Sequence, residues 1–236
     1  MKLSVLMPVF NEAKTLEEAI RRVQEVGFPK EIIAVDDGST DGSRDILERM
    51  EAEAKKNGAS PNDFKVVLKP VNQGKGAAIR SGLAHVTGDV VIIQDADLEY
   101  EPGDYANLLE PILAGRADVV YGTRFSGGGP HRVLFFWHDV GNKLLTLFSN
   151  SLTNLNLTDM EVGYKAFRAE VIKGLKLESN RFGFEPEVTM KVAKKGCRVY
   201  EVPISYYGRT YAEGKKITWK DGLAAVYWSI LYRLKD

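Results

Sequence analysis

The apolar positions of this 236-residue chain change their spacing regularly along its first half. Short apolar runs predict strands over residues 3–8, 31–37, 64–68, 89–94 and 119–123. Apolar residues at helical spacing predict helices over 13–26, 41–56, 74–86 and 102–113, with Thr40 or Asp41 as the N-cap of the second. Because strands alternate with helices, we expect an α/β fold with a mostly parallel sheet covered on both faces.

The second half has a less regular pattern. A glycine-rich break at 127–130 precedes a segment that mixes apolar and polar residues (131–152) and a stretch that becomes strand-like by residue 168. The remaining pattern predicts a helix over 185–195, a strand over 198–204, a basic loop over 208–222 and a terminal amphipathic helix over 223–235.

Composition excludes several classes of protein. Apolar residues make up 44% of the chain, which argues against disorder, and 32 basic residues balance 32 acidic ones, which argues against a general nucleic-acid binder. The single cysteine, Cys197, excludes a disulfide framework and a cysteine-based zinc site. The N-terminal apolar run is too short for a signal peptide, and the run 223–231 is about half the ~20 residues of a membrane-spanning helix.

The neutral total hides an asymmetry between the two halves. Residues 1–110 carry 13 basic and 20 acidic side chains, a net charge of −7, and residues 111–236 carry a net charge of +7. We therefore expect an acidic or metal-binding site in the first half and an anion-binding site in the second.

Acidic residues follow two of the predicted strands. Asp95 and Asp97 form a D-x-D pair that can share one hard cation such as Mg²⁺ or Mn²⁺, and Glu99 is a possible third ligand. Asp36 and Asp37 follow another strand, where an acid can accept hydrogen bonds from a ribose or a base. A solvated polar turn is the alternative for both motifs.

Two further segments suit a nucleoside diphosphate. The loop 72–76 precedes a helix but lacks the first glycine and the trailing Ser or Thr of a Walker A motif, so a plain helix start explains it equally well. The basic loop 209–216 contains Arg209 and Lys216, which can close on a diphosphate, although a solvated loop has the same composition. A nucleoside pocket, a metal and mobile cations together fit a nucleotide-sugar.

Taken together, these motifs resemble those of family 2 glycosyltransferases with a GT-A fold. The resemblance is carried by Pro8-Val-Phe-Asn-Glu12, Asp36-Asp37-Gly-Ser-Thr-Asp-Gly42, Asn72-x-Gly-Lys-Gly76 and Gln94-Asp-Ala-Asp97-Leu-Glu-Tyr-Glu-Pro102. Within that family, Tyr121-Gly-Thr-Arg124-Phe, Thr158-Asp159-Met-Glu-Val-Gly163-Tyr-Lys165 and Arg209…Gly214-Lys-Lys216 are similar to the dolichol-phosphate mannose synthase branch.

The resemblance implies roles for individual residues. The nucleoside and donor would contact Pro8, Phe10, Glu12, Asp37, Lys75 and Asp95. The metal would be bound by Asp95 and directly by Asp97, with Glu99 standing where the branch often has Gln. The catalytic set would be Asp97, Arg124, Asp159 and Arg209, with Lys216 in the closing loop. His138 stands where the branch often has an Arg for the acceptor phosphate, and Arg132 is a nearby substitute.

The activity implied is inverting transfer of a hexose from a UDP- or GDP-sugar to a polyprenyl phosphate. The alternative is a soluble enzyme of cell-envelope polysaccharide biosynthesis that acts on a sugar hydroxyl, for which Asp159 or Glu185 would serve as the base unless both are structural. A sugar nucleotidyltransferase would need a glycine-rich basic loop after the first strand, and 9–12 contain neither glycine nor cation. An intact D-x-D pair argues against a non-catalytic sensor, and the lack of Q-x-x-R-W against a processive synthase.

The tryptophans indicate contact with a membrane. Trp137, Trp219 and Trp228 lie in two segments beside other aromatic and basic residues, a mixture that suits the headgroup layer, although core packing is the alternative. We predict peripheral attachment on the cytoplasmic face. We also predict one GT-A domain over 1–236, in which 1–125 bind nucleotide-sugar and metal and 126–236 bind the acceptor and face the membrane.

Overall fold

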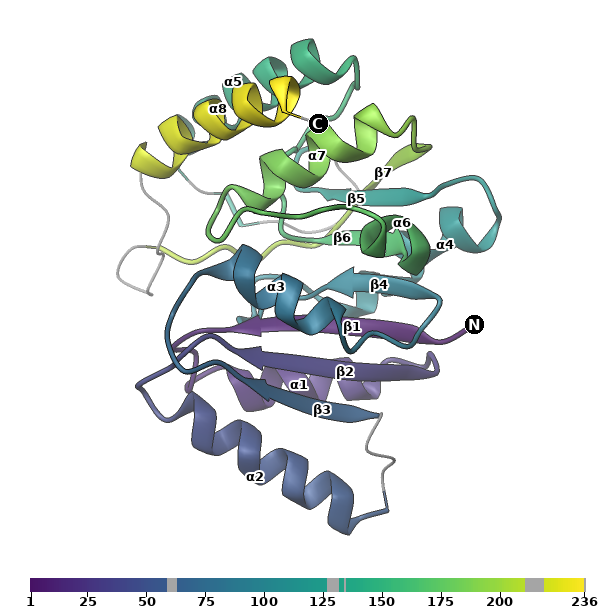
Figure 1. The fold of residues 1–236 in the computed structure, drawn as a ribbon, viewed down its shortest axis with the longest axis vertical. Coiled ribbons are helices and arrows are strands. Elements are labelled where there is room, and N and C mark those ends of the chain that lie inside the picture. The colour runs from purple at the N-terminus through teal and green to yellow at the C-terminus, as the bar shows by residue number, and fades with distance from the viewer. Residues whose placement is uncertain (59–62, 127–131, 134, 211–218, 236) are drawn as a thin grey trace. The chain divides into compact units, whose positions relative to one another are not determined.

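A computed structural model describes residues 1–58, 63–126, 132–133, 135–210 and 219–235, with the backbone alone at 219–221 (Figure 1). The chain divides into two compact units. Unit 1 consists of Met1–Leu98 and Ala166–Arg181, and unit 2 consists of Glu99–Lys165 and Phe182–Asp236. The predicted division at residue 125 remains a prediction, whereas the unit boundaries lie at Leu98, Lys165 and Arg181.

Unit 1 is built on strands in the order β3-β2-β1-β4-β6, of which β1, β2, β3 and β4 run parallel. The strands are β1 (Leu3–Val9), β2 (Lys30–Asp36), β3 (Phe64–Leu68), β4 (Val90–Ile93) and β6 (Lys165–Arg168), of which the first residue belongs to unit 2. β1 pairs in parallel with β2 and β4, and β2 pairs in parallel with β3. The carboxyl ends of β1, β2, β3 and β4 therefore share one edge, and the acidic motifs at 36–37 and 95–97 follow β2 and β4.

Four helices accompany these strands: α1 (Leu16–Glu25), α2 (Ser43–Lys56), α3 (Lys75–Leu83) and α6 (Ala169–Lys173). α3 packs on β1 and β2 and lies in front of them in Figure 1, with α1 behind the sheet. Close packing of α3 requires Gly82, because a Cβ atom there would overlap the side chain of Leu6.

The N-cap predicted for α2 was wrong. Gly42, with φ of 97°, is the N-cap and makes no side-chain cap hydrogen bond. Asp41 instead accepts hydrogen bonds from Ser43 N at 3.0 Å and Ser43 Oγ at 2.6 Å, and from Ala13 N at 2.9 Å. Asp41 therefore joins the start of α2 to the loop after β1.

Unit 2 contains two parallel strands and a set of helices. The strands β5 (Val119–Thr123) and β7 (Val199–Pro203) pair directly. The helices are the short 3₁₀ helix η1 (Pro102–Asp104), α4 (Tyr105–Leu113), α5 (Phe136–Thr153), α7 (Phe184–Lys194) and α8 (Trp219–Leu234). α4 packs on β5 and β7, while α5, α7 and α8 pack on one another.

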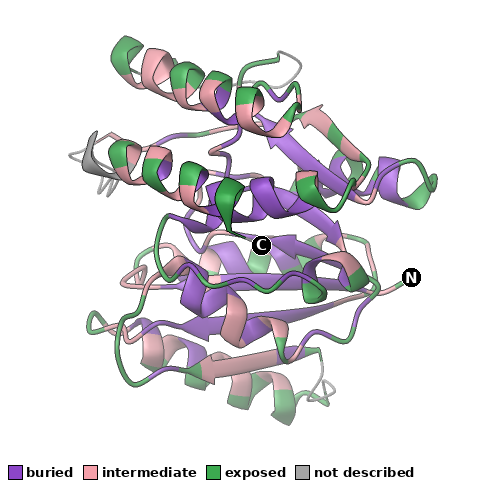
Figure 2. Cartoon of the chain, turned by 45° about the horizontal axis from the view of Figure 1, so that its top comes forward, coloured by how far each residue is buried: buried purple, intermediate pink, exposed green. Residues whose placement is uncertain are grey.

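The predicted strands and most predicted helices are confirmed within a few residues. In Figure 2 most of the strand segments are coloured as buried, as their continuous apolar runs predict. The sequence pattern did not predict α5 or α6, and α8 begins at Trp219 inside the segment expected to be a loop. No helix of the described residues has the length and apolar character needed to cross a bilayer.

Candidate functional site

Asp37, which follows β2, is bound on several sides by unit 1. Its side chain is 3% exposed and forms an ion pair with Lys69. It also accepts hydrogen bonds from the backbone N–H groups of Gln73 at 3.1 Å and Gly74 at 2.6 Å. Asp37, which was predicted to bind the nucleoside, therefore also fixes the loop that leads into α3.

Asp36 has a different set of partners. Its buried carboxylate accepts from the N–H groups of Gly38 and Ser39 and from Arg44 Nε and Nη2, the last at 2.8 Å. Gly38 has a φ of 76°, and a Cβ atom there would lie 2.7 Å from Asn72 N, so glycine is required. Asp36 thus stabilises the turn after β2.

The segment after β1 is tied to that same turn. Asn11 N donates to Ser39 Oγ at 3.0 Å, and Thr40 N donates to Asn11 Oδ1 at 2.9 Å. Asn11 adopts a positive φ of 53°, which Asn tolerates better than most residues. In this segment the predicted donor-binding residues Pro8, Phe10 and Glu12 are all partly exposed, so a ligand can reach them.

The D-x-D pair follows β4. Asp95 forms an ion pair of 2.8 Å with Lys75, the first residue of α3. Asp97 is 9% exposed, and the carbonyl of Ala96 between them accepts a hydrogen bond of 3.2 Å from Thr15 Oγ1. Unit 1 thus places Asp95 beside Lys75, both of which were predicted to bind the donor.

These two carboxylates fit a hard divalent cation. In the described residues, no three His, Cys, Asp or Glu side chains gather into a metal-binding group. Mg²⁺ and Mn²⁺ accept such incomplete protein coordination, because substrate phosphates and water supply the other ligands. When bound, the ion would neutralise charge on a leaving diphosphate.

The start of α3 is held by a distant part of unit 1. Arg80 donates to Ser179 O and Asn180 Oδ1, and Ala77 N donates to Asn180 O at 3.1 Å. Gly74, with φ of 101°, lies against the same segment, where a Cβ atom would clash with Asn180 O. The glycines of the loop 72–76 are therefore explained by close backbone packing.

In unit 2, Arg124 and Asp159 form a buried bidentate ion pair. Arg124 Nε donates to Asp159 Oδ2 at 2.6 Å, and Nη2 donates to Oδ1 at 2.7 Å. Asp159 is fully buried and also accepts from Asn142 Nδ2 at 3.3 Å. Burial acts to lower the pKa of Arg124, but Asp159 together with Tyr100 and Tyr206 outweighs it, so this pKa is raised and the guanidinium stays charged.

Two of the predicted cations contact the segment 206–209, and a third belongs to it. The guanidinium of Arg124 lies 5.1 Å from the ring centroid of Tyr206. Arg132 N donates to Tyr206 O at 3.0 Å, and its Nη1 donates to Gly208 O at 3.1 Å. Arg209 is the third, so unit 2 gathers Arg124, Arg132 and Arg209 around one short stretch of chain.

Glu99 lies in unit 2 and binds the segment 206–209. Its carboxylate accepts from Arg209 N at 2.9 Å, Arg209 Nε at 3.1 Å and Tyr206 OH at 3.1 Å. Burial and the Glu99 charge both raise the pKa of Tyr206, so its hydroxyl remains a hydrogen-bond donor. The predicted metal ligand Glu99 therefore has a second interaction with Arg209, which the sequence did not indicate.

The remaining predicted residues lie in several places. His138 is near the start of α5, with its ring 5.4 Å from that of Phe135. Glu185, the alternative base, is 4% exposed in the first turn of α7. Lys216 lies outside the described residues.

Several neighbours of the site were missed by sequence reasoning. Lys69 directly follows β3. The aspartates were predicted as site residues because they follow strands, and the same reasoning would have predicted Lys69. Glu161 lies within the motif that includes Asp159. By contrast, nothing in the local sequence marks Asn142 as a partner of Asp159 or Tyr206 as a partner of Arg124.

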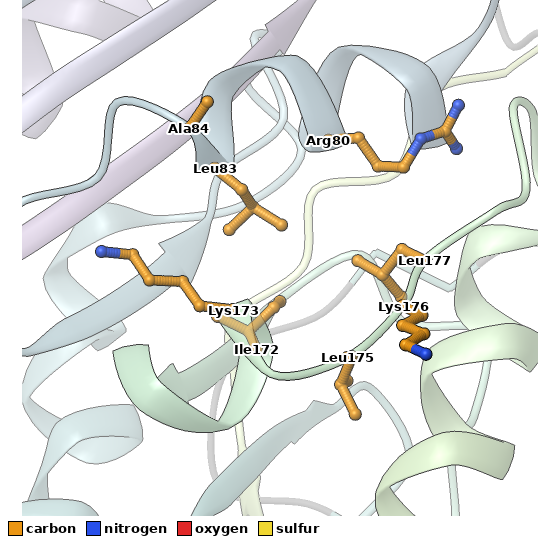
Figure 3. A pocket seen from close by; sticks show the side chains of 8 residues that line it. All are labelled: Arg80, Leu83, Ala84, Ile172, Lys173, Leu175, Lys176 and Leu177. Atoms are coloured by element: carbon orange, nitrogen blue, oxygen red, sulfur yellow. The ribbon is translucent and has the colours of Figure 1, made fainter.

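A pocket of about 350 Å³ lies elsewhere on unit 1 (Figure 3). Its lining residues are Arg80, Leu83, Ala84, Ile172, Lys173, Leu175, Lys176 and Leu177. Leu83 points towards Ile172 in Figure 3, and none of the lining residues belongs to the predicted site. We assign no role to this pocket.

Comparison with known proteins identifies similar sequences. The family model described as glycosyl transferase family 2 matches residues 4–175. Glycosyltransferase AglJ of Haloferax volcanii is 31% identical over 87% of this chain and 63% of its own length. The undecaprenyl-phosphate mannosyltransferase of Micrococcus luteus is 29% identical over 91% of this chain and 87% of its own length.

Two further comparisons bear on length and fold. The dolichol-phosphate mannosyltransferase of Pyrococcus furiosus is 29% identical over 91% of this chain, which matches only 59% of that protein. The glucosyl-3-phosphoglycerate synthase of Mycobacterium tuberculosis, solved with Mn²⁺ and UDP-glucose, superimposes with a TM-score of 0.73 at 22% identity. That match covers 98% of this chain and 78% of the other, and it confirms the predicted GT-A fold.

Proposed function

Because this chain belongs to glycosyl transferase family 2, we propose that it transfers a hexose from a nucleoside-diphosphate sugar to the phosphate of a polyprenyl phosphate, with inversion at the anomeric carbon. The observation that carries this proposal is the pairing of Asp159 with Arg124. A sugar hydroxyl acceptor needs a general base, and Asp159 is buried with both oxygens bound by Arg124. A phosphate acceptor is already ionised and needs cations that position it.

Unit 1 would bind the donor. The partly exposed residues Pro8, Phe10 and Glu12 would contact the nucleoside together with Asp37. Asp95 and Asp97 would bind Mg²⁺ or Mn²⁺, and Lys75 would contact the diphosphate. The solved neighbour with Mn²⁺ and UDP-glucose supports this class of donor for the fold.

Unit 2 would bind the acceptor phosphate through its arginines. Arg124, Arg132 and Arg209 gather around 206–209, and arginine suits phosphate because its planar guanidinium can donate two parallel hydrogen bonds. His138 and Lys216 would add further contacts. The names of the Micrococcus luteus and Pyrococcus furiosus relatives supply the acceptor class, a polyprenyl phosphate.

The surface of α5 and α8 supports contact with a membrane. On α5, the exposed side chains Trp137, Leu144 and Leu147 recur every three or four residues around the partly exposed Val140, whereas Thr146 and Ser149 are buried. This arrangement reverses that of an ordinary surface helix, which buries its apolar stripe.

α8 also exposes an apolar stripe, although it buries Ala225 and Tyr232. Leu223, Tyr227, Ile230 and Leu234 are all at least 44% exposed and follow a 4-3-4 spacing, while Ser229 is buried. α5 and α8 contact each other, and exposed Lys143 and Arg233 lie on them. An exposed apolar surface with basic residues suits the headgroup layer of an anionic bilayer, so we propose peripheral attachment through these two helices.

The test is incubation of the purified chain with Mn²⁺, polyprenyl phosphate in detergent, and UDP-glucose, UDP-galactose or GDP-mannose in turn. We expect a polyprenyl-linked sugar with one donor, and we expect Asp97→Ala to abolish it without changing the thermal unfolding midpoint by more than a few degrees. Asp45→Asn, at an exposed position of α2, is the matched control. Absence of the lipid product with every donor, or full activity of Asp97→Ala, would contradict the proposal.

A further inference from the structure

A polar face of α5 holds the loop that carries Asp159. Asn150 accepts a hydrogen bond from Leu157 N at 3.2 Å and donates one to Leu157 O at 2.8 Å. One turn earlier on the same face, Thr146 Oγ1 accepts a hydrogen bond from Met160 N at 3.1 Å. These contacts lie on both sides of Asp159, so α5 holds the loop before and after this residue.

Asn142, one turn before Thr146, reaches the Asp159 carboxylate itself. Its Nδ2 donates to Asp159 Oδ1 at 3.3 Å, and its Oδ1 accepts from Thr146 Oγ1 at 3.2 Å. The same Asp159 oxygen accepts from Arg124 Nη2 at 2.7 Å. One oxygen atom therefore joins α5 to the guanidinium that would bind the acceptor phosphate.

The backbone of Asp159 has a separate support in unit 2. The carboxylate of Glu201 in β7 accepts hydrogen bonds from Thr158 N at 2.9 Å and from Asp159 N at 3.1 Å. β7 pairs directly with β5, and Arg124 directly follows β5. The two strands thus keep Arg124 and Asp159 close together, while Asn142 sets how the carboxylate and its bound guanidinium are turned.

α5 itself is docked with little burial of large apolar side chains. Among its 18 residues, all of which the structure describes, only Thr146 and Ser149 are buried, although the helix contacts α7 and α8. A hydrogen bond that replaces one to water stabilises a contact less than burial of a large apolar side chain does. An element with few buried apolar contacts opens at low cost, so a surface that favours the docked position of α5 can tighten this network.

A bilayer favours that docked position for a geometric reason. Docked α5 contacts α8, and both helices expose apolar side chains, so one bilayer surface can cover the two helices together (Figure 1). A ligand shifts an equilibrium only by the difference in its affinity for the two states. A bilayer that covers α5 and α8 side by side buries more apolar area than one that covers α8 alone, and this difference stabilises the docked state.

We propose that contact of α5 with an anionic bilayer orders the acceptor-phosphate site, and that Asn142 is the positioning residue that transmits this contact to Arg124 through Asp159. The inference rests on the proposed function, because it takes Arg124 as a ligand of the acceptor phosphate and the bilayer as the partner of α5. It adds regulation of that site, since the arginine is fully oriented only at the surface where a lipid acceptor lies.

The test measures the KM of a short, water-soluble acceptor, geranyl phosphate, with and without vesicles of phosphatidylcholine and phosphatidylglycerol. Wild type is compared with Asn142→Leu, which keeps the approximate size of the side chain but cannot donate to Asp159. Both chains meet the same partition of the acceptor into lipid, so the comparison cancels it. We expect vesicles to lower the KM of the acceptor about fivefold more for wild type than for Asn142→Leu, with kcat and the KM of the donor unchanged within about twofold.

Thr146→Val keeps the test informative if Asn142→Leu fails to fold. It preserves the shape of the side chain but removes the hydroxyl that donates to Asn142 and accepts from Met160 N, so we expect the same loss of the vesicle effect. Asn107→Leu, at an exposed position of α4 in the same unit, is the matched control and should behave as wild type. Vesicle sedimentation should show equal membrane binding for all these chains, because Asn142 and Thr146 do not belong to the exposed apolar surface.

Three outcomes would overturn the inference. The first is an equal effect of vesicles on the KM of the acceptor in wild type and in both variants. The second is a lower kcat with an unchanged KM in both variants, as a loss of correctly folded protein produces. The third is a loss of vesicle binding by the variants, which would place Asn142 in the attachment itself. Failure of wild type to bind vesicles, or to form a polyprenyl-linked sugar from a long-chain acceptor in detergent, would instead contradict the proposed function, and both are measured beforehand.

Discussion

Four acidic residues at the sites of the two units each hold a basic partner. Asp37 binds Lys69 and Asp95 binds Lys75 in unit 1, and in unit 2 Asp159 binds Arg124 and Glu99 binds Arg209. A ligand that binds one member of such a pair must compete with the other member. The pairs therefore make binding of cation and of anion interdependent.

The pair of Lys75 and Asp95 gives a prediction for metal binding. Lys75→Gln removes the cation that occupies Asp95, so we expect Mn²⁺ to bind more tightly when no nucleotide is present. The same variant should bind nucleoside diphosphate more weakly, because it lacks a positive charge for the phosphates. Mn²⁺ titration followed by electron paramagnetic resonance, with and without UDP or GDP, measures both changes, and weaker binding of Mn²⁺ alone would contradict the prediction.

The buried pair in unit 2 gives a prediction for Arg124→Lys. Lysine retains the charge but cannot form the two parallel hydrogen bonds to Asp159, so we expect a loss of about 1–3 kcal/mol in the free energy of unfolding. Urea unfolding measures this loss. Lys143→Arg, at an exposed ion pair of α5, is the control and should change stability by less than about 0.5 kcal/mol. A similarly small change for Arg124→Lys would show that the bidentate geometry is unimportant.

At the scale of helices and strands, the sequence pattern predicted those elements that bury an apolar run or an apolar stripe. Buried parallel strands appear as continuous apolar runs, and α1 buries Leu16, Ala19, Ile20 and Val23 at helical spacing, so these elements were found. α5 was missed because its buried positions include Thr146 and Ser149 while its large apolar residues are exposed. Periodicity detects a helix through its apolar buried face, which α5 does not have.

The exposed apolar surface of α5 and α8 gives a prediction for membrane binding. Leu144→Glu combined with Ile230→Glu should reduce binding to vesicles of anionic phospholipid about tenfold or more, since each charge must enter the apolar layer. Vesicle sedimentation measures the bound fraction. Leu113→Glu, at an exposed leucine of α4, controls for the loss of surface leucine and the added charge. Equal binding of the double variant and this control would contradict the proposal.

At the scale of the whole chain, the fold class and the identity of the family were predictable and many contacts were not. Strand-end acids and the motifs quoted above indicate a GT-A glycosyltransferase from the sequence alone. The pairs Arg124–Asp159 and Glu99–Arg209 join residues 35 and 110 positions apart. No periodic pattern reports such pairs, because they depend on how loops from different elements meet.

Glu161 gives a prediction for the stability of the whole chain against pH. Its pKa is about 8 in the folded chain against 4.5 as the ordinary value, so the folded state binds more protons between these values. This group therefore makes the free energy of unfolding fall as pH rises from about 4.5 to 8. Urea unfolding at intervals of one pH unit should show Glu161→Gln gaining stability relative to wild type across that window. A constant difference would contradict the prediction.

The packing of Gly74 and Ala77 against Asn180 has a consequence for the order in which the protein is made. Unit 1 starts at the N-terminus but needs Ala166–Arg181, which the ribosome adds only after all of Glu99–Lys165. The loop that leads into α3 therefore lacks a contact surface during much of translation. Nascent chains that end before residue 166 should protect this loop poorly from proteolysis, and chains that extend beyond residue 181 should protect it well.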